Sequence, residues 1–233
     1  MSEMVKHKNL SNINELRKQL ITLCILDIIM LPKKESYNRY RHYVENSYIK
    51  HSEEILDVFK LDNGSGDDLY VIFAKEGCII KGFAHESSIS PYGNNNKVWK
   101  GIYDETPENL LSLLNDPFFC KNDVTFCVWR QSNDSDWLKG NITVPNNYND
   151  SNFGDGFRYL CDDFLANSPS DYCNWAIEYH ELFELNSPSL KSMEQTVKQI
   201  YDGAEINEVM IKALNPKRNV TEALKEISLL PAK

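Results

Sequence analysis

The chain has 233 residues, 42% of them hydrophobic, and a formal net charge of −9 at pH 7. This length and apolar content predict a packed globular protein and exclude both a disordered chain and a small fold that depends on disulfides or metals. A surface of this charge repels phosphate backbones, so the composition argues against a nucleic-acid partner and favours solubility or a basic protein partner.

The first predicted element is a helix from Ser11 to Leu31, with Ser11 as the N-cap and Pro32 as the stop. Its apolar run is about 12 residues long, short of the ~20 that a membrane-spanning helix needs, and no signal-peptide cleavage pattern follows. We therefore expect a cytoplasmic protein without membrane association. Asp27 falls inside the apolar stripe of this helix. It is either a buried carboxylate held by cationic or hydrogen-bonding partners, or a catalytic or switch carboxylate with a raised pKa.

A group of strands comes next. The segment 36–50 is rich in Tyr, Arg and His and favours an extended conformation, with a short helix as the alternative. Asn63–Gly66 and Glu76–Gly77 carry turn residues between apolar runs, which is typical of hairpins. The predicted strands are 54–61, 69–74, 78–84 and 124–130.

The rest of the chain reads mostly as helix. Thr106 and Asn219 are predicted N-caps, each in a local pattern that favours a helix start. The predicted helices are 108–115, 154–167, 170–181, 189–201, 206–214 and 220–230. Strands grouped before helices indicate an α+β fold: a mostly antiparallel sheet of about five or six strands, packed by an N-terminal helix and several C-terminal helices. We expect a single domain over 1–233, sheet-rich at about 36–145 and helical at about 153–231.

Familiar cofactor and catalytic motifs are absent from the sequence. It lacks a P-loop, a complete dinucleotide fingerprint, H-E-x-x-H and the G-x-S-x-G nucleophile elbow. Cys173, Glu178, His180 and Glu181 match no familiar zinc spacing and read as a solvated helix face. The sequence therefore predicts neither a cofactor nor a metal site.

Weak candidates for acid–base catalysis follow the strand 78–84, where His85 and Glu86 enter a serine-rich loop. Adjacent residues of an extended chain point in opposite directions, so a loop that hydrogen-bonds its own backbone is the alternative interpretation. Arg130 ends the strand 124–130 and, with Asp27, completes the catalytic candidates. Together with the nearby tryptophans, Arg130 has the composition of an interface hot spot, but large aromatics equally fill cores.

The negative charge is concentrated in one part of the sequence. The segment 134–171 holds seven aspartates and only two cationic residues. A local negative field of this kind steers a basic ligand. The predicted binding residues are Asp134, Asp136, Asp150, Asp155, Asp162, Asp163, Trp99 and Trp137.

Several stretches of the sequence resemble an uncharacterised family of bacterial cytoplasmic proteins. These are 63–67 (NGSGD), 80–87 with 90–91 (IKGFAHES and SP), 98–99 (VW) and 125–130 (TFCVWR). The resemblance covers roughly residues 20 to 215 and implies no established activity. Such families look like immunity proteins of toxin systems, which are acidic α+β proteins without a catalytic signature.

The leading hypothesis is a non-enzymatic binding protein, of immunity or inhibitor type, that binds a basic, toxin-like protein through its acidic segment. The alternative is an enzyme of unknown class that uses His85 and Glu86 in a pocket, together with Asp27 or Arg130. A scaffold or oligomerisation module is a third option, which an extensive apolar surface would favour.

Overall fold

The computed structural model describes residues 3–5, 10–49, 56–144, 154–180 and 190–232. The chain divides into two compact units. Unit 1 consists of Met1–Leu16 and His42–Phe164, and unit 2 consists of Arg17–Arg41 and Leu165–Lys233. The expectation of one folding domain over the whole chain stays a prediction.

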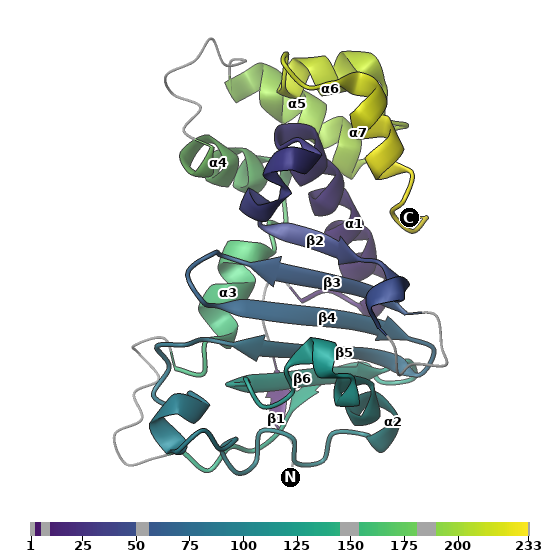
Figure 1. Cartoon of the computed structure of the whole chain (residues 1–233). Coiled ribbons are helices and arrows are strands. Elements are labelled where there is room, and N and C mark those ends of the chain that lie inside the picture. The colour runs from purple at the N-terminus through teal and green to yellow at the C-terminus, as the bar shows by residue number, and fades with distance from the viewer. Residues whose placement is uncertain (1–2, 6–9, 50–55, 145–153, 181–189, 233) are drawn as a thin grey trace. The chain divides into compact units, whose positions relative to one another are not determined.

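Unit 1 is built on a sheet that has seven strands within the described residues, in the order β1-β7-β6-β5-β4-β3-β2 (Figure 1). All the pairs from β3 to β7, and the pair of β1 with β7, are antiparallel. The strands are β1 (Glu3–Val5), β2 (Arg41–Val44), β3 (Asp57–Asp62), β4 (Asp68–Ala74), β5 (Gly77–Phe83), β6 (Phe126–Gln131) and β7 (Trp137–Lys139).

The predicted α+β class, with a mostly antiparallel sheet, an N-terminal helix and several C-terminal helices, is confirmed. Two strands that the sequence did not mark, β1 and β7, have three residues each, too few to show an alternating pattern. The segment 36–50 contains both of the predicted alternatives. A 3₁₀ turn, η1 (Lys33–Asn38), precedes β2, and a second one, η2 (Asn46–Tyr48), follows it.

Two tight turns fix the register of the central strands. In the β3–β4 turn, Asn63 Oδ1 accepts hydrogen bonds from the backbone N–H groups of Ser65 (2.8 Å) and Asp67 (3.1 Å). Gly64 and Gly66 adopt positive φ angles there, which glycine reaches without strain. The β4–β5 turn at residues 75–76 is shorter and places Ala74 opposite Gly77.

Each face of the sheet in unit 1 is covered by a different helix. One face carries Tyr70, Ile79 and Trp129, which pack with Leu110 of α2 (Glu108–Leu111) in a buried apolar cluster. The opposite face carries Phe126, whose ring lies 5.3 Å from that of Phe157 at the start of α3 (Phe157–Phe164). This arrangement explains why β4 and β5 are apolar on both sides.

Three 3₁₀ turns complete the described elements of unit 1. These are η3 (Pro91–Asn94), η4 (Ser112–Asn115) and η5 (Pro117–Phe119). Two predicted helix starts differ from the structure. Asn12, and not Ser11, caps the first helix by accepting a hydrogen bond from Glu15 N at 3.0 Å. The Thr106 side chain does not cap α2, because Pro107 holds the N-cap position and no side chain accepts a capping hydrogen bond there.

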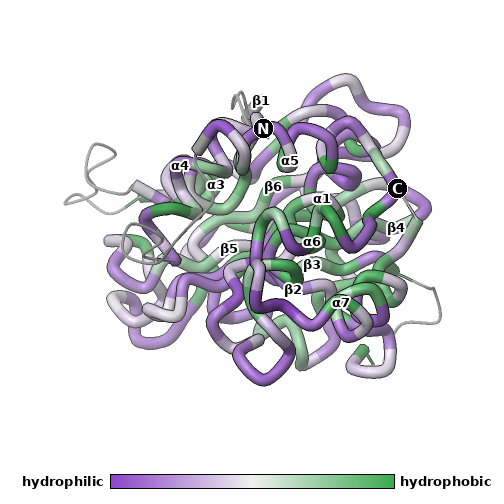
Figure 2. The backbone as a smooth tube through the Cα atoms, turned by 90° about the horizontal axis from the view of Figure 1, so that it is seen from above, coloured by the Kyte–Doolittle hydropathy of each residue, from purple (hydrophilic) through white to green (hydrophobic). Residues whose placement is uncertain are grey.

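Unit 2 is helical. Asn219 caps its last helix as predicted, because its Oδ1 accepts a hydrogen bond from Glu222 N at 3.0 Å. Hydrophobic and hydrophilic stretches alternate along that helix in Figure 2, as an amphipathic helix requires. No helix among the described residues is long and apolar enough to cross a membrane. The helices are α1 (Ile13–Met30, which begins in unit 1), α4 (Pro169–Tyr179), α5 (Leu190–Tyr201), α6 (Glu208–Leu214) and α7 (Val220–Ile227).

Candidate functional site

A hydrogen-bonded carboxylate–imidazole pair lies where the chain leaves β5. His85 follows the strand end, and Asp67 comes from the β3–β4 turn. Asp67 Oδ1 lies 2.7 Å from His85 Nδ1 and accepts the His85 backbone N–H at 2.8 Å. Its other oxygen, Oδ2, accepts from the Tyr159 hydroxyl at 2.7 Å and from Asn63 Nδ2 at 2.9 Å. One carboxylate therefore joins the β3–β4 turn, the exit of β5 and helix α3.

These contacts determine the protonation of Asp67. Burial raises the pKa of Asp67, but the hydrogen bonds from Tyr159, His85 and Asn63 outweigh burial and hold this pKa below its usual value. The carboxylate is therefore ionised at neutral pH and only accepts hydrogen bonds, so His85 Nδ1 donates to it. His85 Nε2 lies 3.8 Å from Glu86 Oε1.

Ser87 provides no nucleophile for this pair. Its Oγ donates to the Gly154 carbonyl at 2.6 Å and accepts from the Ile89 backbone N–H at 3.2 Å. The hydroxyl is buried and points away from solvent. Ser87 thus forms a hydrogen bond with the backbone of its own loop, as the alternative interpretation of this loop predicted.

The other catalytic candidates lie elsewhere. Arg130 is paired in register with Cys78, near the start of β5. The strand from Cys78 to Phe83 spans about 16 Å at ~3.3 Å per residue, and His85 lies beyond its far end. Arg130 Nε instead donates to the Asp134 carbonyl at 3.0 Å. Asp27 belongs to unit 2. The sheet register therefore separates Arg130 from His85 and Glu86.

Asp27 forms a buried ion pair with Arg41. Its Oδ1 lies 3.3 Å from Arg41 Nη1, and its Oδ2 accepts the Arg41 backbone N–H at 3.0 Å. Burial raises the pKa of Asp27, and the Arg41 guanidinium opposes this shift. The guanidinium lies 4.1 Å from the centre of the Trp175 ring, a cation–π contact. Asp27 is therefore a buried carboxylate held by a cationic partner, which was the first of the two interpretations predicted from the sequence.

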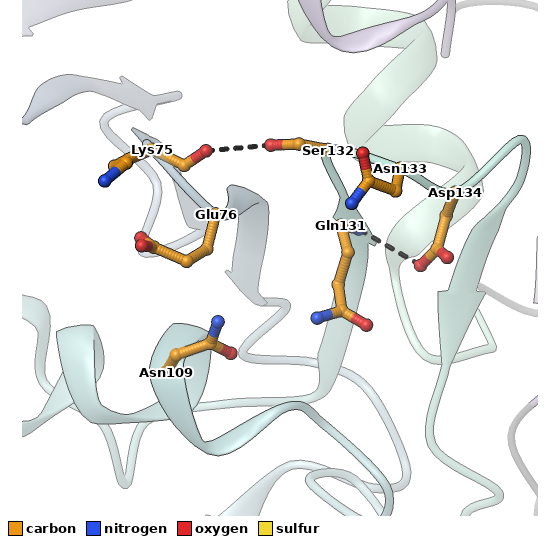
Figure 3. Close-up of a pocket in the computed structure, with 7 residues that line it drawn as sticks. All are labelled: Lys75, Glu76, Asn109, Gln131, Ser132, Asn133 and Asp134. Carbon is orange, nitrogen blue, oxygen red and sulfur yellow. Dashed lines mark hydrogen bonds between the residues drawn. The ribbon is translucent and has the colours of Figure 1, made fainter.

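A polar pocket lies at the opposite end of β5 from His85. It has a volume of about 320 Å³ and is formed by the β4–β5 turn, the β6–β7 turn and the start of α2 (Figure 3). Its lining residues are Lys75, Glu76, Asn109, Gln131, Ser132, Asn133 and Asp134. Only Asp134 of this set was among the predicted binding residues.

The predicted acidic residues do not form one uniform surface. Asp134 is half-buried and Asp136 is exposed, and both lie in or beside the β6–β7 turn. Asp155 is buried, accepts a hydrogen bond from Phe157 N at 2.9 Å and lies 3.6 Å from Lys139 Nζ. Asp162 is exposed on α3. Asp150 and the side chain of Asp163 lie outside the described residues.

The two predicted binding tryptophans are largely buried, and each donates its indole N–H to a backbone carbonyl. Trp137 is 3% exposed and its Nε1 donates to the Ser11 carbonyl at 2.8 Å. Trp99 is half-buried and its Nε1 donates to the Ser90 carbonyl at 3.3 Å. Trp137 is thus a core residue, because its ring packs inside and its only polar atom is satisfied by the backbone.

Asp67, Tyr159 and the amides of the pocket were not among the residues predicted from the sequence. Asp67 is the last residue of the Asn63–Asp67 turn and directly precedes β4. Because β4 and β5 form a hairpin, the residues before β4 lie beside those that follow β5, including His85. Nothing local marks Tyr159, because its contact depends on how α3 packs. Within the described residues, no three His, Cys, Asp or Glu side chains lie close enough together to hold a metal ion.

Comparisons with models of known protein families, with curated proteins and with solved structures give no significant match. The resemblance to an uncharacterised bacterial family therefore stays a prediction.

Proposed function

We propose that this chain is a non-enzymatic binding protein, of inhibitor or immunity type, that associates with a basic protein through the acidic turns of unit 1. The observation that carries the proposal is the grouping of Glu76, Asp134 and Asp136 on two turns at one end of the sheet. The catalytic candidates, by contrast, are engaged in structural contacts or lie at the other end of β5.

Charge supports the same function. The net charge of −9 gives the chain a negative field at neutral pH. Complementary charges at an interface mainly raise the association rate and make it sensitive to salt. The partner is therefore expected to be basic, and binding is expected to weaken as salt rises.

The test begins with capture of partners from the native host and their identification by mass spectrometry. Association rates of the identified partner are then compared for the wild type, for Asp134→Asn/Asp136→Asn and for Glu194→Gln/Glu205→Gln. The last variant removes the same charge from exposed residues of unit 2. We expect the first variant to slow association by about tenfold or more and the second to have a small effect. Equal effects, or none, would refute the acidic turns as the binding surface.

A second function is favoured by one specific contact. Asp67 holds His85 Nδ1 at 2.7 Å and so directs Nε2 away from itself, on a side chain that is 37% exposed; a carboxylate orients the imidazole of a general base in this way. If His85 serves in hydrolysis, the purified protein should cleave activated ester substrates and His85→Gln should abolish this activity. The absence of turnover above the buffer rate would end this second proposal.

A further inference from the structure

The polar pocket at the β4–β5 and β6–β7 turns has a lining unlike that of most small-molecule sites. Pockets for drug-sized ligands are mostly apolar with a few polar groups. Here every lining residue is polar or charged, and no aromatic ring is present on which a sugar or a base could stack. The chemistry of the lining therefore indicates an occupant rich in hydrogen-bond donors or acceptors.

Some polar groups of the lining are already used. Ser132 Oγ donates to the Lys75 carbonyl at 2.9 Å, and Asp134 Oδ2 accepts from Gln131 N at 3.3 Å, as the dashed lines in Figure 3 show. Asn109 Oδ1 accepts from Leu110 N at 3.0 Å. These bonds hold the walls of the pocket.

Other groups of the lining are available to a ligand. Within the described residues, the Glu76 carboxylate and the side-chain amides of Gln131 and Asn133 make no hydrogen bond or ion pair. Figure 3 shows the side-chain amides of Asn109 and Gln131 facing each other across the pocket, with the Glu76 side chain beside them below Lys75. The available acceptors are thus one carboxylate and two amide oxygens. Lys75 and Asp134 bring opposite charges to the lining, so the Glu76 carboxylate gives it a net negative charge, which favours a cation.

The backbone keeps this arrangement rigid. The two turns are joined by the hydrogen bond from Ser132 N to the Glu76 carbonyl at 2.8 Å, and the β6–β7 turn is closed by Asp134 N to the Gln131 carbonyl at 3.0 Å. A Cβ atom on Gly77 would lie 2.3 Å from the Arg130 carbonyl oxygen, so only glycine allows this close approach. A preformed site loses little conformational entropy on binding.

We propose that this pocket accepts the guanidinium group of an arginine side chain from a basic protein partner, an inference that rests on the proposed binding function. A guanidinium is planar, always charged and carries five N–H donors with no acceptor. It can pair with the Glu76 carboxylate and still donate to amide oxygens of Gln131 and Asn133. A lysine ammonium is a compact charge with three donors and uses the dispersed amides less well.

The probe for this proposal is Nα-acetyl-arginine-methylamide, titrated into the ¹⁵N-labelled full-length protein and followed by NMR. We expect saturable shifts of the side-chain amide resonances of Asn109, Gln131 and Asn133, with a dissociation constant on the order of 1–10 mM. The citrulline analogue has the same shape without the charge and should cause no saturable shift. The lysine analogue should bind more weakly than the arginine analogue.

Two variants distinguish binding in the pocket from attraction of the analogue by the net negative charge of the protein. Glu76→Gln should weaken binding of the arginine analogue by about tenfold, because it removes a charge-assisted hydrogen bond. Glu108→Gln is the matched control, since this exposed carboxylate precedes Asn109 on α2 but does not line the pocket. Saturable binding of citrulline, no shift with arginine, or equal weakening in both variants would overturn the assignment.

The same variants distinguish a failure of this inference from a failure of the proposed function. If the captured partner responds to Asp134→Asn/Asp136→Asn but not to Glu76→Gln, the acidic turns bind the partner and the arginine pocket is wrong. If the arginine analogue binds saturably but none of these variants changes association with the partner, the pocket is real and the proposed binding surface is wrong.

Discussion

Asp67 Oδ1 accepts hydrogen bonds from the side-chain Nδ1 and the backbone N–H of His85, at 2.7 and 2.8 Å. These bonds join the residue before β4 to the residues after β5 at the open end of the hairpin. The same carboxylate reaches Tyr159 on α3 at 2.7 Å. A single side chain thus joins three segments of unit 1 that lie far apart in the sequence. Removal of the carboxylate should destabilise the protein, because the partly buried donors that it accepts from would be left unsatisfied.

Replacement of Asp67 by Asn should destabilise the protein by about 2–3 kcal/mol, because charge-assisted hydrogen bonds are lost and one acceptor becomes a donor. Urea unfolding followed by circular dichroism measures the change. Asp104→Asn is the control, because Asp104 is an exposed loop residue of the same type. The two variants should converge as the pH falls through about 4 and below, since a carboxylate with a lowered folded-state pKa contributes stability only while it is ionised. A cost within about 0.5 kcal/mol at pH 7 would show that the Asp67 contacts do not hold unit 1 together.

His180 should make the stability of unit 2 depend on pH. Burial, reinforced by the Arg41 guanidinium, lowers its pKa from 6.5 to about 4. Between these two values the unfolded chain binds the proton and the folded chain does not, so the contribution of His180 is full above pH 6.5 and is lost as the pH falls toward 4. Unfolding free energies of wild type and His180→Gln over this range should therefore differ in slope, with the variant less dependent on pH. Parallel curves would mean that His180 titrates normally in the folded protein.

Gly82→Ala should destabilise the protein by about 2 kcal/mol or more, because a Cβ atom there would lie 2.0 Å from the Phe126 ring, which packs against Phe157 of α3. Gly93→Ala is the matched control, since its nearest neighbour would lie 3.9 Å away. Thermal unfolding of both variants measures the difference. Equal melting temperatures would show that Phe126 moves aside freely and that the β5–α3 packing is loose.

The Asp27–Arg41 pair should be more sensitive to the loss of one partner than to the loss of both. Asp27→Leu alone leaves a buried guanidinium without its carboxylate and should cost about 3–5 kcal/mol. The double variant Asp27→Leu/Arg41→Met removes both charges and should recover much of this loss. A double-mutant cycle by denaturant unfolding gives the coupling energy. Additive costs would mean that Asp27 and Arg41 are stabilised independently.

Much of the sheet could be predicted because its central strands are long apolar runs between glycine-containing turns. The β4–β5 turn is two residues long, so its register was implied by the sequence: Ala74 opposite Gly77 places Asp67 beside the exit of β5. The contact of Asp67 with His85 was therefore within reach of local reasoning. The three-residue strands β1 and β7 were not, because a pairing of that length is decided by tertiary packing.

The candidate sites were less predictable, since they depend on which groups already have partners. Asp155 and Trp137 looked like surface residues from composition but are buried, because Asp155 caps the start of α3 and Trp137 bonds the Ser11 carbonyl. Asn109 and Gln131 meet at the pocket although a strand and a helix carry them separately. No local pattern marks which amides come together at a pocket after folding.

The most direct measurement of the central claim is hydrogen–deuterium exchange of the protein with and without its captured basic partner. We expect slower exchange at residues 75–77 and 131–136 in the complex, with little change at the His85 loop. Protection confined to unit 2 or to residues 85–90, with the two acidic turns unchanged, would contradict it.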